Sequence, residues 1–224
     1  MFYYFEKELE VAKNKGERDY IPFDFDYQHQ YAEGQLENDK FPDFEPRFSK
    51  IILKKKSRLV DVINDHGAIG GYGFVISPKL KGILEKYRLT PTRFYPVTVL
   101  HDNTEYDYYW MQNLTMDNLH WIDFSQSIFM DTKGSYDREL ASEIKFNDAS
   151  SLLAKQETYT SLYPIMIHSL VLNEQYNDNP YDFFYFHELQ NGATISEKLK
   201  TELEKEKITG LEKFYLRSIT TQNG

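Results

Sequence analysis

The sequence contains one short passage twice, 119 residues apart. Residues 76–90 read ISPKLKGILEKYRLT and residues 195–209 read ISEKLKTELEKEKIT, so nine of the 15 positions are identical. Beyond this passage the copies continue with one extra residue in the second, and Phe94-Tyr95 corresponds to Phe214-Tyr215. A repeat of this density indicates two copies of one structural unit. It predicts how the fold is organised and does not by itself indicate a chemistry.

Each copy is predicted to fold as a strand, a helix and a second strand, over residues 74–100 and 193–220. In the first copy Ser77 is placed to cap a helix that has Pro78 in its first turn. The spacing i, i+3, i+4, i+7 then gives this helix one apolar stripe, which consists of Leu80, Ile83, Leu84 and Tyr87. We expect this stripe to pack against a sheet.

The second helix is expected to be more exposed than the first. Leu199 and Leu203 keep the stripe, with Ile208 as a further candidate beyond them, while Glu202 and Glu206 replace apolar residues. After each helix the chain is expected to return as a strand, at residues 94–99 and 214–219. Pro96 favours an edge position or a bulge in the first of these strands.

The remaining sequence predicts further strands and few helices. Residues 106–111, 120–124 and 183–186 are short aromatic strand candidates, and residues 165–172 are apolar on both faces, as in a central strand. His168 lies in this last segment, where we expect a hydrogen-bonded core imidazole. The pattern predicts an α+β fold of mostly antiparallel sheets on which the two repeated units pack.

Residues 1–50 differ in composition from residues 51–224, which we expect to form the α+β core. Prolines interrupt a run of aromatic and acidic residues in this first segment, so we predict an irregular arm that packs on the core through its rings. Asp24 and Asp26 alternate with the rings of neighbouring residues such as Tyr27, as in a strand with one solvent-exposed face. An ordinary edge strand and a surface for a partner are both compatible with this pattern.

The composition excludes several classes of function. The net charge of −9 disfavours binding to nucleic acid and favours a basic partner, although it can equally serve solubility alone. The chain has no cysteine, so disulfides, thiolate nucleophiles and thiolate metal sites are excluded. No signal-peptide core and no apolar run of about 20 residues is present, so we expect a cytoplasmic protein without a membrane partner.

The sequence motifs do not predict an active site. The glycine cluster at residues 67–73 precedes a strand instead of opening a helix, so it does not fit a phosphate loop. The six histidines include no pair at metal-ligand spacing, and we predict neither a metal nor a cofactor. Asp102, Glu105 and Asp107 surround a predicted hairpin turn at Asn103, where a solvated turn is the simplest interpretation.

Several segments together resemble one bacterial family. They are residues 76–81 with Leu84, Glu85 and residues 94–97; residues 57–61 before the first copy; residues 108–110; the segment IDFSQS at residues 122–127; and residues 195–215. In these segments the chain is similar to a family of immunity proteins of polymorphic-toxin systems, immunity family eleven, which was formerly a domain of unknown function. The likeness extends from about Lys54 to Phe214.

The resemblance implies a cytoplasmic protein that neutralises a cognate toxin by binding and occluding it, without catalysis, and it carries over no catalytic or cofactor residue. We therefore expect a non-enzymatic binding protein with an acidic, ring-rich contact surface. The residues expected to bind the partner are Asp24, Asp26, Tyr27, Asp102, Glu105 and Tyr106. The alternative hypothesis is a hydrolase-like enzyme whose histidine and aspartate residues are brought together by folding.

Overall fold

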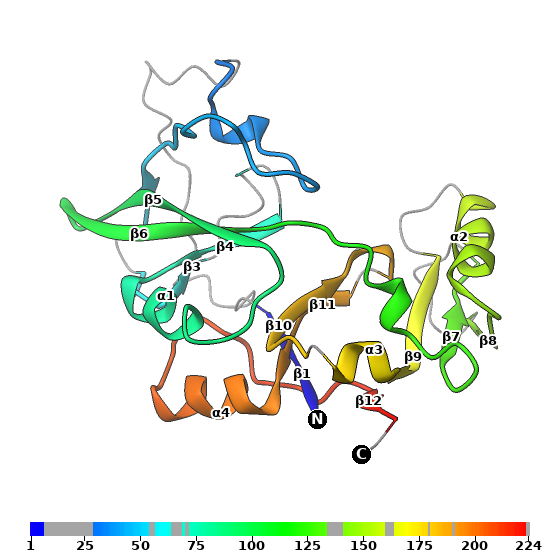
Figure 1. Cartoon of the computed structure of the whole chain (residues 1–224). Coiled ribbons are helices and arrows are strands. Elements are labelled where there is room, and N and C mark those ends of the chain that lie inside the picture. Colours follow the sequence, from blue (N-terminus) through cyan, green and yellow to red (C-terminus); the bar gives the residue numbers. More distant parts are fainter. Residues whose placement is uncertain are drawn as a thin grey trace. The chain divides into compact units, whose positions relative to one another are not determined.

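The computed structural model describes residues 1–6, 29–53, 57–63, 69, 72–133, 141–159, 164–178, 180–189 and 191–222. In these residues it contains four α-helices and twelve strands, arranged in mostly antiparallel sheets, which confirms the predicted α+β class (Figure 1). The chain divides into two compact units that are discontinuous in sequence. Residues 1–5, 116–200 and 215–224 form one unit, and residues 6–115 and 201–214 form the other. No helix in the described ranges is long and apolar enough to cross a membrane.

The second of these units contains a five-stranded sheet in the order β2-β5-β6-β4-β3. Its strands are β2 (Ile51–Ile52), β3 (Val62–Ile63), β4 (Tyr72–Ile76), β5 (Thr92–His101) and β6 (Thr104–Asn113). β6 is antiparallel to both β4 and β5, and β2 is parallel to β5. The helix α1 (Pro78–Leu84) joins β4 to β5, so the first repeat copy is a strand-helix-strand unit with β6 between its two strands.

The local sequence explains where α1 begins and which face it buries. Ser77 accepts a hydrogen bond from the backbone N–H of Leu80 at 3.1 Å, and Pro78 occupies the first turn, as predicted. Leu80, Ile83 and Leu84 are buried. Burial of three such side chains contributes on the order of 1.5–3 kcal/mol each.

Residues 29–50 lie within the predicted N-terminal arm and belong to the same unit. Their described part contains one short 3₁₀ helix, η1 (Glu33–Gln35), and otherwise neither helix nor strand. Leu36 and Phe48 pack in the apolar cluster of this unit with Tyr95 and Trp110 of the sheet. The buried Glu33 accepts hydrogen bonds from the backbone N–H and the hydroxyl of Ser49, both at 3.0 Å. The rest of the arm-and-core organisation stays a prediction, because residues 7–28 lie outside the described part.

The other unit contains two sheets, with strand orders β1-β11-β10 and β12-β9-β7-β8. The first sheet consists of β1 (Phe2–Phe5), β10 (Phe183–Phe186) and β11 (Asn191–Ser196). The second consists of β7 (Ile128–Asp131), β8 (Ser142–Ile144), β9 (Ile165–Leu172) and β12 (Ile219–Thr221). The helices α2 (Ala149–Glu157) and α3 (Glu174–Asn177) belong to this unit, and the division of the chain passes through α4 (Glu197–Lys205). Phe2–Phe5 is therefore a regular strand and not part of an irregular arm.

Residues 215–217 connect these two sheets. Tyr4 donates its backbone N–H to Tyr215 at 3.0 Å, Arg217 donates its backbone N–H to Phe2 at 2.9 Å, and Leu216 lies opposite Tyr3. The chain then continues into β12, which pairs in parallel with β9. Residues 215–221 therefore run between β1 and β9, and the strand order becomes β10-β11-β1-(215–221)-β9.

This order is the same as β3-β4-β6-β5-β2 in the other unit, and the residue registers agree as well. In the first copy, Tyr109 of β6 lies opposite Ile76 of β4 and Pro96 of β5. In the second copy, Tyr3 of β1 lies opposite Ile195 and Leu216, which are the residues equivalent to Ile76 and Pro96. Likewise, Val99 pairs with Ile51 of β2, and Ile219 pairs with Leu170 of β9. The repeat therefore covers a whole five-stranded module with its helix.

The two modules differ in where one strand comes from. In the first, β6 follows β5 directly along the chain. In the second, the equivalent strand is β1, at the opposite end of the sequence (Figure 1). The second module is therefore a circular permutation of the first, completed by residues 2–5.

Two pairs of side-chain contacts repeat between the modules. Ser77 donates its hydroxyl to Asp61 at 2.7 Å, and Ser196 donates its hydroxyl to Asp182 at 2.7 Å. Their equivalence is supported by the register, because each aspartate immediately precedes the strand that pairs with β4 or β11. The ammonium of Lys81 lies 5.1 Å from the ring centre of Tyr109, and that of Lys200 lies 4.8 Å from the ring centre of Tyr3. The identical residues of the repeat thus serve capping and packing.

Three strand predictions need correction. Residues 120–124 form the end of η2 (Leu119–Trp121) and a turn, because the chain bends there instead of pairing along its length. The return strand of the second copy is regular only at Ile219–Thr221, after the single bridge at Leu216, which is 60% exposed. β9 is an interior strand, as predicted, but its pairing with β7 shifts register between Ile167 and Ser169, and His168 at this bulge is exposed.

Candidate functional site

The β5–β6 hairpin ends in a tight two-residue turn that carries predicted partner-binding residues. β5 and β6 pair without interruption from Thr92 opposite Asn113 to His101 opposite Thr104. The turn residues Asp102 and Asn103 have φ of 47° and 64°. Positive φ at both positions is typical of the type I′ turn, which matches the twist of the flanking strands and which Asn and Asp tolerate. The predicted solvated hairpin turn is therefore present.

Residues 102–107, which we call the hairpin tip, are all exposed. Glu105 and Asp107 point to one face of β6 and Tyr106, which is 37% exposed, points to the other. Glu105 forms an ion pair with Lys50, and both side chains are half-exposed. The tip thus presents three carboxylates, those of Asp102, Glu105 and Asp107, against one lysine, and the ring of Tyr106 lies on the opposite face of β6 from Glu105 and Asp107.

The base of the hairpin tip is held in place by two hydrogen bonds to residues 57–60. The Nε2 atom of His101 lies 2.8 Å from the carbonyl oxygen of Ser57, and the same ring lies 3.8 Å from the carboxylate of Asp102. Tyr108 donates its hydroxyl to the carbonyl of Val60 at 2.8 Å, and burial raises the pKa of this phenol. The tip is therefore an exposed acidic loop on a fixed base.

The other three predicted partner-binding residues, Asp24, Asp26 and Tyr27, lie outside the described residues. The three predicted residues that the structure does describe, Asp102, Glu105 and Tyr106, lie together at the hairpin tip. Sequence reasoning did not connect Lys50 with this site, because no local signal places residue 50 next to residue 105.

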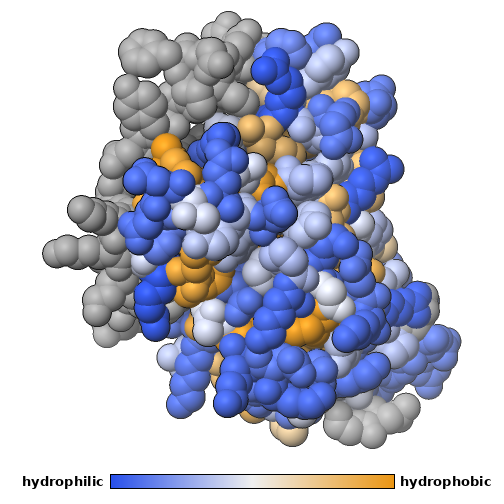
Figure 2. Space-filling view, turned by 90° about the vertical axis from the view of Figure 1, so that its left-hand side faces the viewer, coloured by the Kyte–Doolittle hydropathy of each residue, from blue (hydrophilic) through white to orange (hydrophobic). Residues whose placement is uncertain are grey.

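Figure 2 shows the surface from the side on which the β5–β6 turn lies in Figure 1. Hydrophilic residues predominate on this face, and hydrophobic residues form small, separate patches. Large contiguous apolar patches usually mark obligate interfaces. The described residues visible in Figure 2 are mostly hydrophilic, unlike such an interface.

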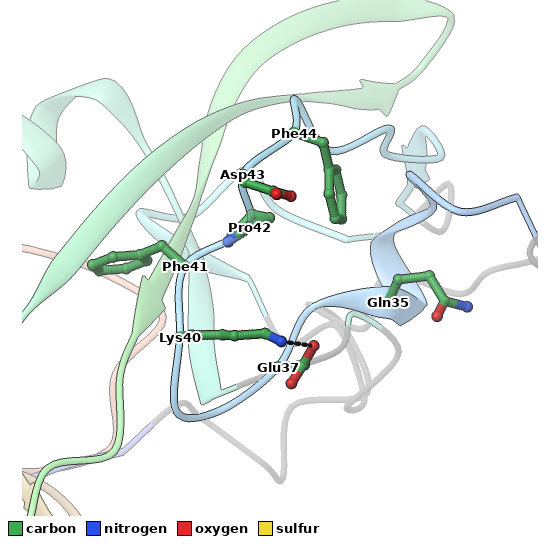
Figure 3. Close-up of a pocket in the computed structure, with 7 residues that line it drawn as sticks. All are labelled: Gln35, Glu37, Lys40, Phe41, Pro42, Asp43 and Phe44. Carbon is green, nitrogen blue, oxygen red and sulfur yellow. Dashed lines mark ion pairs between the residues drawn. The ribbon is translucent and has the colours of Figure 1, made fainter.

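A hollow of about 240 Å³ lies in the segment between η1 and Phe44 (Figure 3). Lys40 reaches across it to Glu37 at 2.9 Å, and this hydrogen bond raises the pKa of the lysine. The lining also contains Gln35, Phe41, Pro42, Asp43 and Phe44. The guanidinium of Arg93 stacks on Phe41, 4.4 Å from the ring centre. The hollow is therefore lined by polar and aromatic side chains, with the Lys40–Glu37 ion pair among them.

Among the described residues, the largely buried His101 lies 3.8 Å from Asp102, and the exposed His168 lies 3.6 Å from Glu143. In the described residues, no three His, Asp or Glu side chains are grouped so that they could hold a metal ion. His168 lies on the rim of a hollow lined by Met130 and Met166, and its exposure contradicts the core role expected from the sequence.

His187 and Glu188 lie in a 3₁₀ helix, η4 (His187–Leu189), directly after β10. The His187 ring stacks on Tyr185 with 4.8 Å between centres. Burial lowers the pKa of His187 to about 4 and raises the pKa of Glu188. Both shifts favour the neutral side chains and have burial as their main cause. The hypothesis of a histidine-aspartate hydrolase stays a prediction.

The residues that carry the family resemblance occupy structural positions. Asp123 accepts hydrogen bonds from Ser125, Gln126 and Gln222, each at 2.6 Å from its side-chain donor. The buried Ser127 accepts from the backbone N–H of Val171 at 3.0 Å. Together with the capping residue Ser77, they hold loops and helix ends in place.

The sequence matches no protein-family model and no curated protein.

Proposed function

We propose that this protein is a non-catalytic binding protein, an immunity protein that neutralises a cognate bacterial toxin by covering the surface the toxin needs for its activity. The observation that most supports this proposal is the hairpin tip, which presents three exposed carboxylates and Tyr106 on a fixed base. The resemblance to the immunity family supplies the class of partner and a cytoplasmic location.

The charge of the chain suits such a role. A net charge of −9 attracts a basic protein over distances of about a Debye length, roughly 8–10 Å at physiological salt. Complementary charge mainly accelerates association, by up to a few powers of ten at low salt. Asp102, Asp107 and Glu105 are placed to act in this way, because they lie at the outermost point of a long hairpin.

Affinity requires an anchor as well as charge. Tyrosine is enriched among residues that dominate binding energy, because its ring buries a large area at a small cost in conformational entropy. Tyr106 is the exposed ring of the hairpin tip. A complex of standard size would bury about 1,600 Å² in total, so further contacts around the tip are part of the proposal.

The proposal is tested by co-expression with the product of the gene next to the one that encodes this chain, since immunity and toxin genes lie side by side. Expression of the neighbour alone is expected to arrest growth, co-expression is expected to restore it, and the two proteins should co-purify. A toxic neighbour that is neither bound nor neutralised contradicts the proposal.

The involvement of the hairpin tip is tested separately with two double variants. Glu105→Lys with Asp107→Lys reverses charge at the tip and should weaken protection. The matched control reverses two exposed carboxylates far from it in sequence, Glu143→Lys with Glu157→Lys, and should protect like the wild type. An equal loss of protection in both double variants would show that protection depends on the net charge and not on the hairpin tip.

A further inference from the structure

The central strands of the two modules are held to their neighbours in different ways. In the first module, β6 follows β5 through the two-residue turn at Asp102 and Asn103, so the two strands belong to one hairpin. In the second module, β1 pairs on one side with β11 and on the other with residues 215–217. Both of these partners lie far along the sequence from β1, so no tight turn joins β1 to either strand beside it.

The slot that β1 fills binds it along both of its edges. β1 is hydrogen-bonded to β11 on one edge and to residues 215–217 on the other. Three of its four side chains, those of Phe2, Tyr3 and Phe5, are only 6%, 9% and 1% exposed. Without β1, the backbone groups along both edges of the slot would lose their partners, and an open slot favours the addition of another strand. These contacts depend on the residues of β1 and not on the chain that supplies them.

The connection that follows β1 in the sequence is long. Residues 7–28 link residue 6 to the next described segment, which begins at residue 29. An extended chain spans about 3.3 Å per residue, so a connection of this length can reach up to about 70 Å. This length allows β1 to enter the slot of another copy of the chain.

We propose that the second module also binds a second copy of this chain, and that the two copies associate by exchanging their β1 strands. In the exchanged dimer, each β1 lies between β11 and residues 215–217 of the other copy, in the register of the single chain. Each copy gives the same strand and offers the same slot, as in other two-fold interfaces formed by exchange of one element. The proposal is independent of the partner toxin.

The balance between the single chain and the exchanged dimer depends on concentration, because β1 makes the same strand contacts in both. A flexibly tethered segment has an effective concentration of the order of millimolar. The exchanged dimer is therefore expected to become abundant when the chain itself approaches about 1 mM during folding. The first module is not expected to exchange β6, because the two-residue turn keeps this strand beside β5.

Disulfide trapping tests the exchange, because the chain has no cysteine of its own. Tyr3 lies opposite Leu216, and the hydrogen bonds flanking this pair are those of a non-hydrogen-bonded antiparallel pair. The Cα atoms of such a pair lie about 4.5 Å apart, a distance that a disulfide can bridge. Leu216 is 60% exposed, so a substitution there removes little packing.

One chain carries Tyr3→Cys and another carries Leu216→Cys. The two are mixed in urea, refolded together under reducing conditions at about 1 mM and then oxidised. We expect a covalent dimer joined through the two substituted positions, identified by mass spectrometry of the digested product. Refolding at hundredfold lower concentration should reduce its yield by more than about tenfold, because the tethered strand then fills its own slot.

The matched control uses the equivalent pair of the first module, with Tyr109→Cys in one chain and Pro96→Cys in the other. This mixture should give only the background of random collisions. A single chain with both Tyr3→Cys and Leu216→Cys, refolded at the low concentration, should form its disulfide internally, which shows that it folds with β1 in place. The unsubstituted chain should likewise contain dimer by light scattering only after refolding at the high concentration.

Four results would each overturn the proposal. They are equal yields of covalent dimer from the pairs of the two modules, a yield that does not depend on concentration, no covalent dimer after refolding at the high concentration, and no internal disulfide in the doubly substituted chain. The last result would show that β1 does not occupy the slot.

Discussion

Thr209 donates both its backbone N–H and its hydroxyl to one carboxylate oxygen of Asp61, although the two residues are 148 positions apart in the sequence. The other oxygen of the same carboxylate accepts the hydroxyl of Ser77, the residue that caps α1. One aspartate therefore joins the start of the first repeat helix to the segment that follows the second.

Replacing this aspartate should destabilise the chain measurably. Asp61→Ala removes an acceptor used by Thr209 and Ser77, and hydrogen bonds to charged groups contribute about 1.5–3 kcal/mol. We expect a loss of that size in the free energy of unfolding from urea titration. Asp107→Asn, at an exposed position of the hairpin tip, should change it by less than about 0.5 kcal/mol. Equal effects would contradict the role of Asp61.

Gly210 should not tolerate a side chain. Gly210→Ala places a Cβ atom 2.2 Å from the Val62 carbonyl oxygen at φ of +83°, so we expect a loss of more than about 1 kcal/mol. The control is Gly82→Ala within α1, where no heavy atom lies within 4 Å of the added Cβ. That substitution should stabilise the chain by up to about 1 kcal/mol. Urea unfolding of both variants measures the difference, and a neutral Gly210→Ala would contradict the close packing.

The loop around Asp123 should weaken in acid. Hydrogen bonds from Ser125, and also from Gln222 and Gln126, lower the pKa of Asp123 to about 2. Because the folded-state pKa is depressed, this contribution to stability is present above the unfolded value of about 3.9 and is lost as the pH falls towards 2. Carboxyl resonances followed by pH titration should place the midpoint near 2, and Gln222→Ala should raise it. A midpoint near 4 in the wild type would contradict these bonds.

The permuted strand β1 should be essential to its module. Phe5 is 1% exposed and packs edge-on against Phe183, with 5.3 Å between ring centres. Removing a buried phenylalanine costs about 3–5 kcal/mol, so Phe5→Ala should cause a loss of that order. Leu153→Ala, at a position of the same unit that is 40% exposed, is the control and should have a much smaller effect. A small effect of Phe5→Ala in urea unfolding would show that β1 is not part of the folded core.

The repeat allowed the organisation of both helices to be predicted, because capping residues and apolar stripes are local signals. The cap at Ser77, the greater exposure of α4 and the buried positions Leu80, Ile83 and Leu84 of α1 were correctly predicted, but α1 ends at Leu84, so Tyr87 is not part of its apolar stripe. The role of β1 could not be predicted in this way. Phe2–Phe5 and its counterpart in β6 share aromatic character but little identity, and strands that pair across the whole chain leave no local spacing to detect.

The errors have a similar cause. His168 was expected in the core because its segment is apolar, yet it lies at the bulge where β9 shifts register against β7, and its side chain is exposed. The aromatic run at residues 120–124 has strand-like composition, but hydrogen bonds such as that from Asn173 to the carbonyl of His120 hold it as a turn. Lys50 and the Asp61–Thr209 contact are further results of folding that sequence spacing does not reveal.

The most direct test of the proposed function is the association rate of this chain with the product of the neighbouring gene, measured by stopped-flow fluorescence at several salt concentrations. We predict a rate constant that falls steeply with added salt and that is about tenfold lower at low salt for the variant Glu105→Lys with Asp107→Lys. A rate constant that is insensitive to salt and unchanged in this variant would contradict the claim that the acidic hairpin tip guides a basic partner.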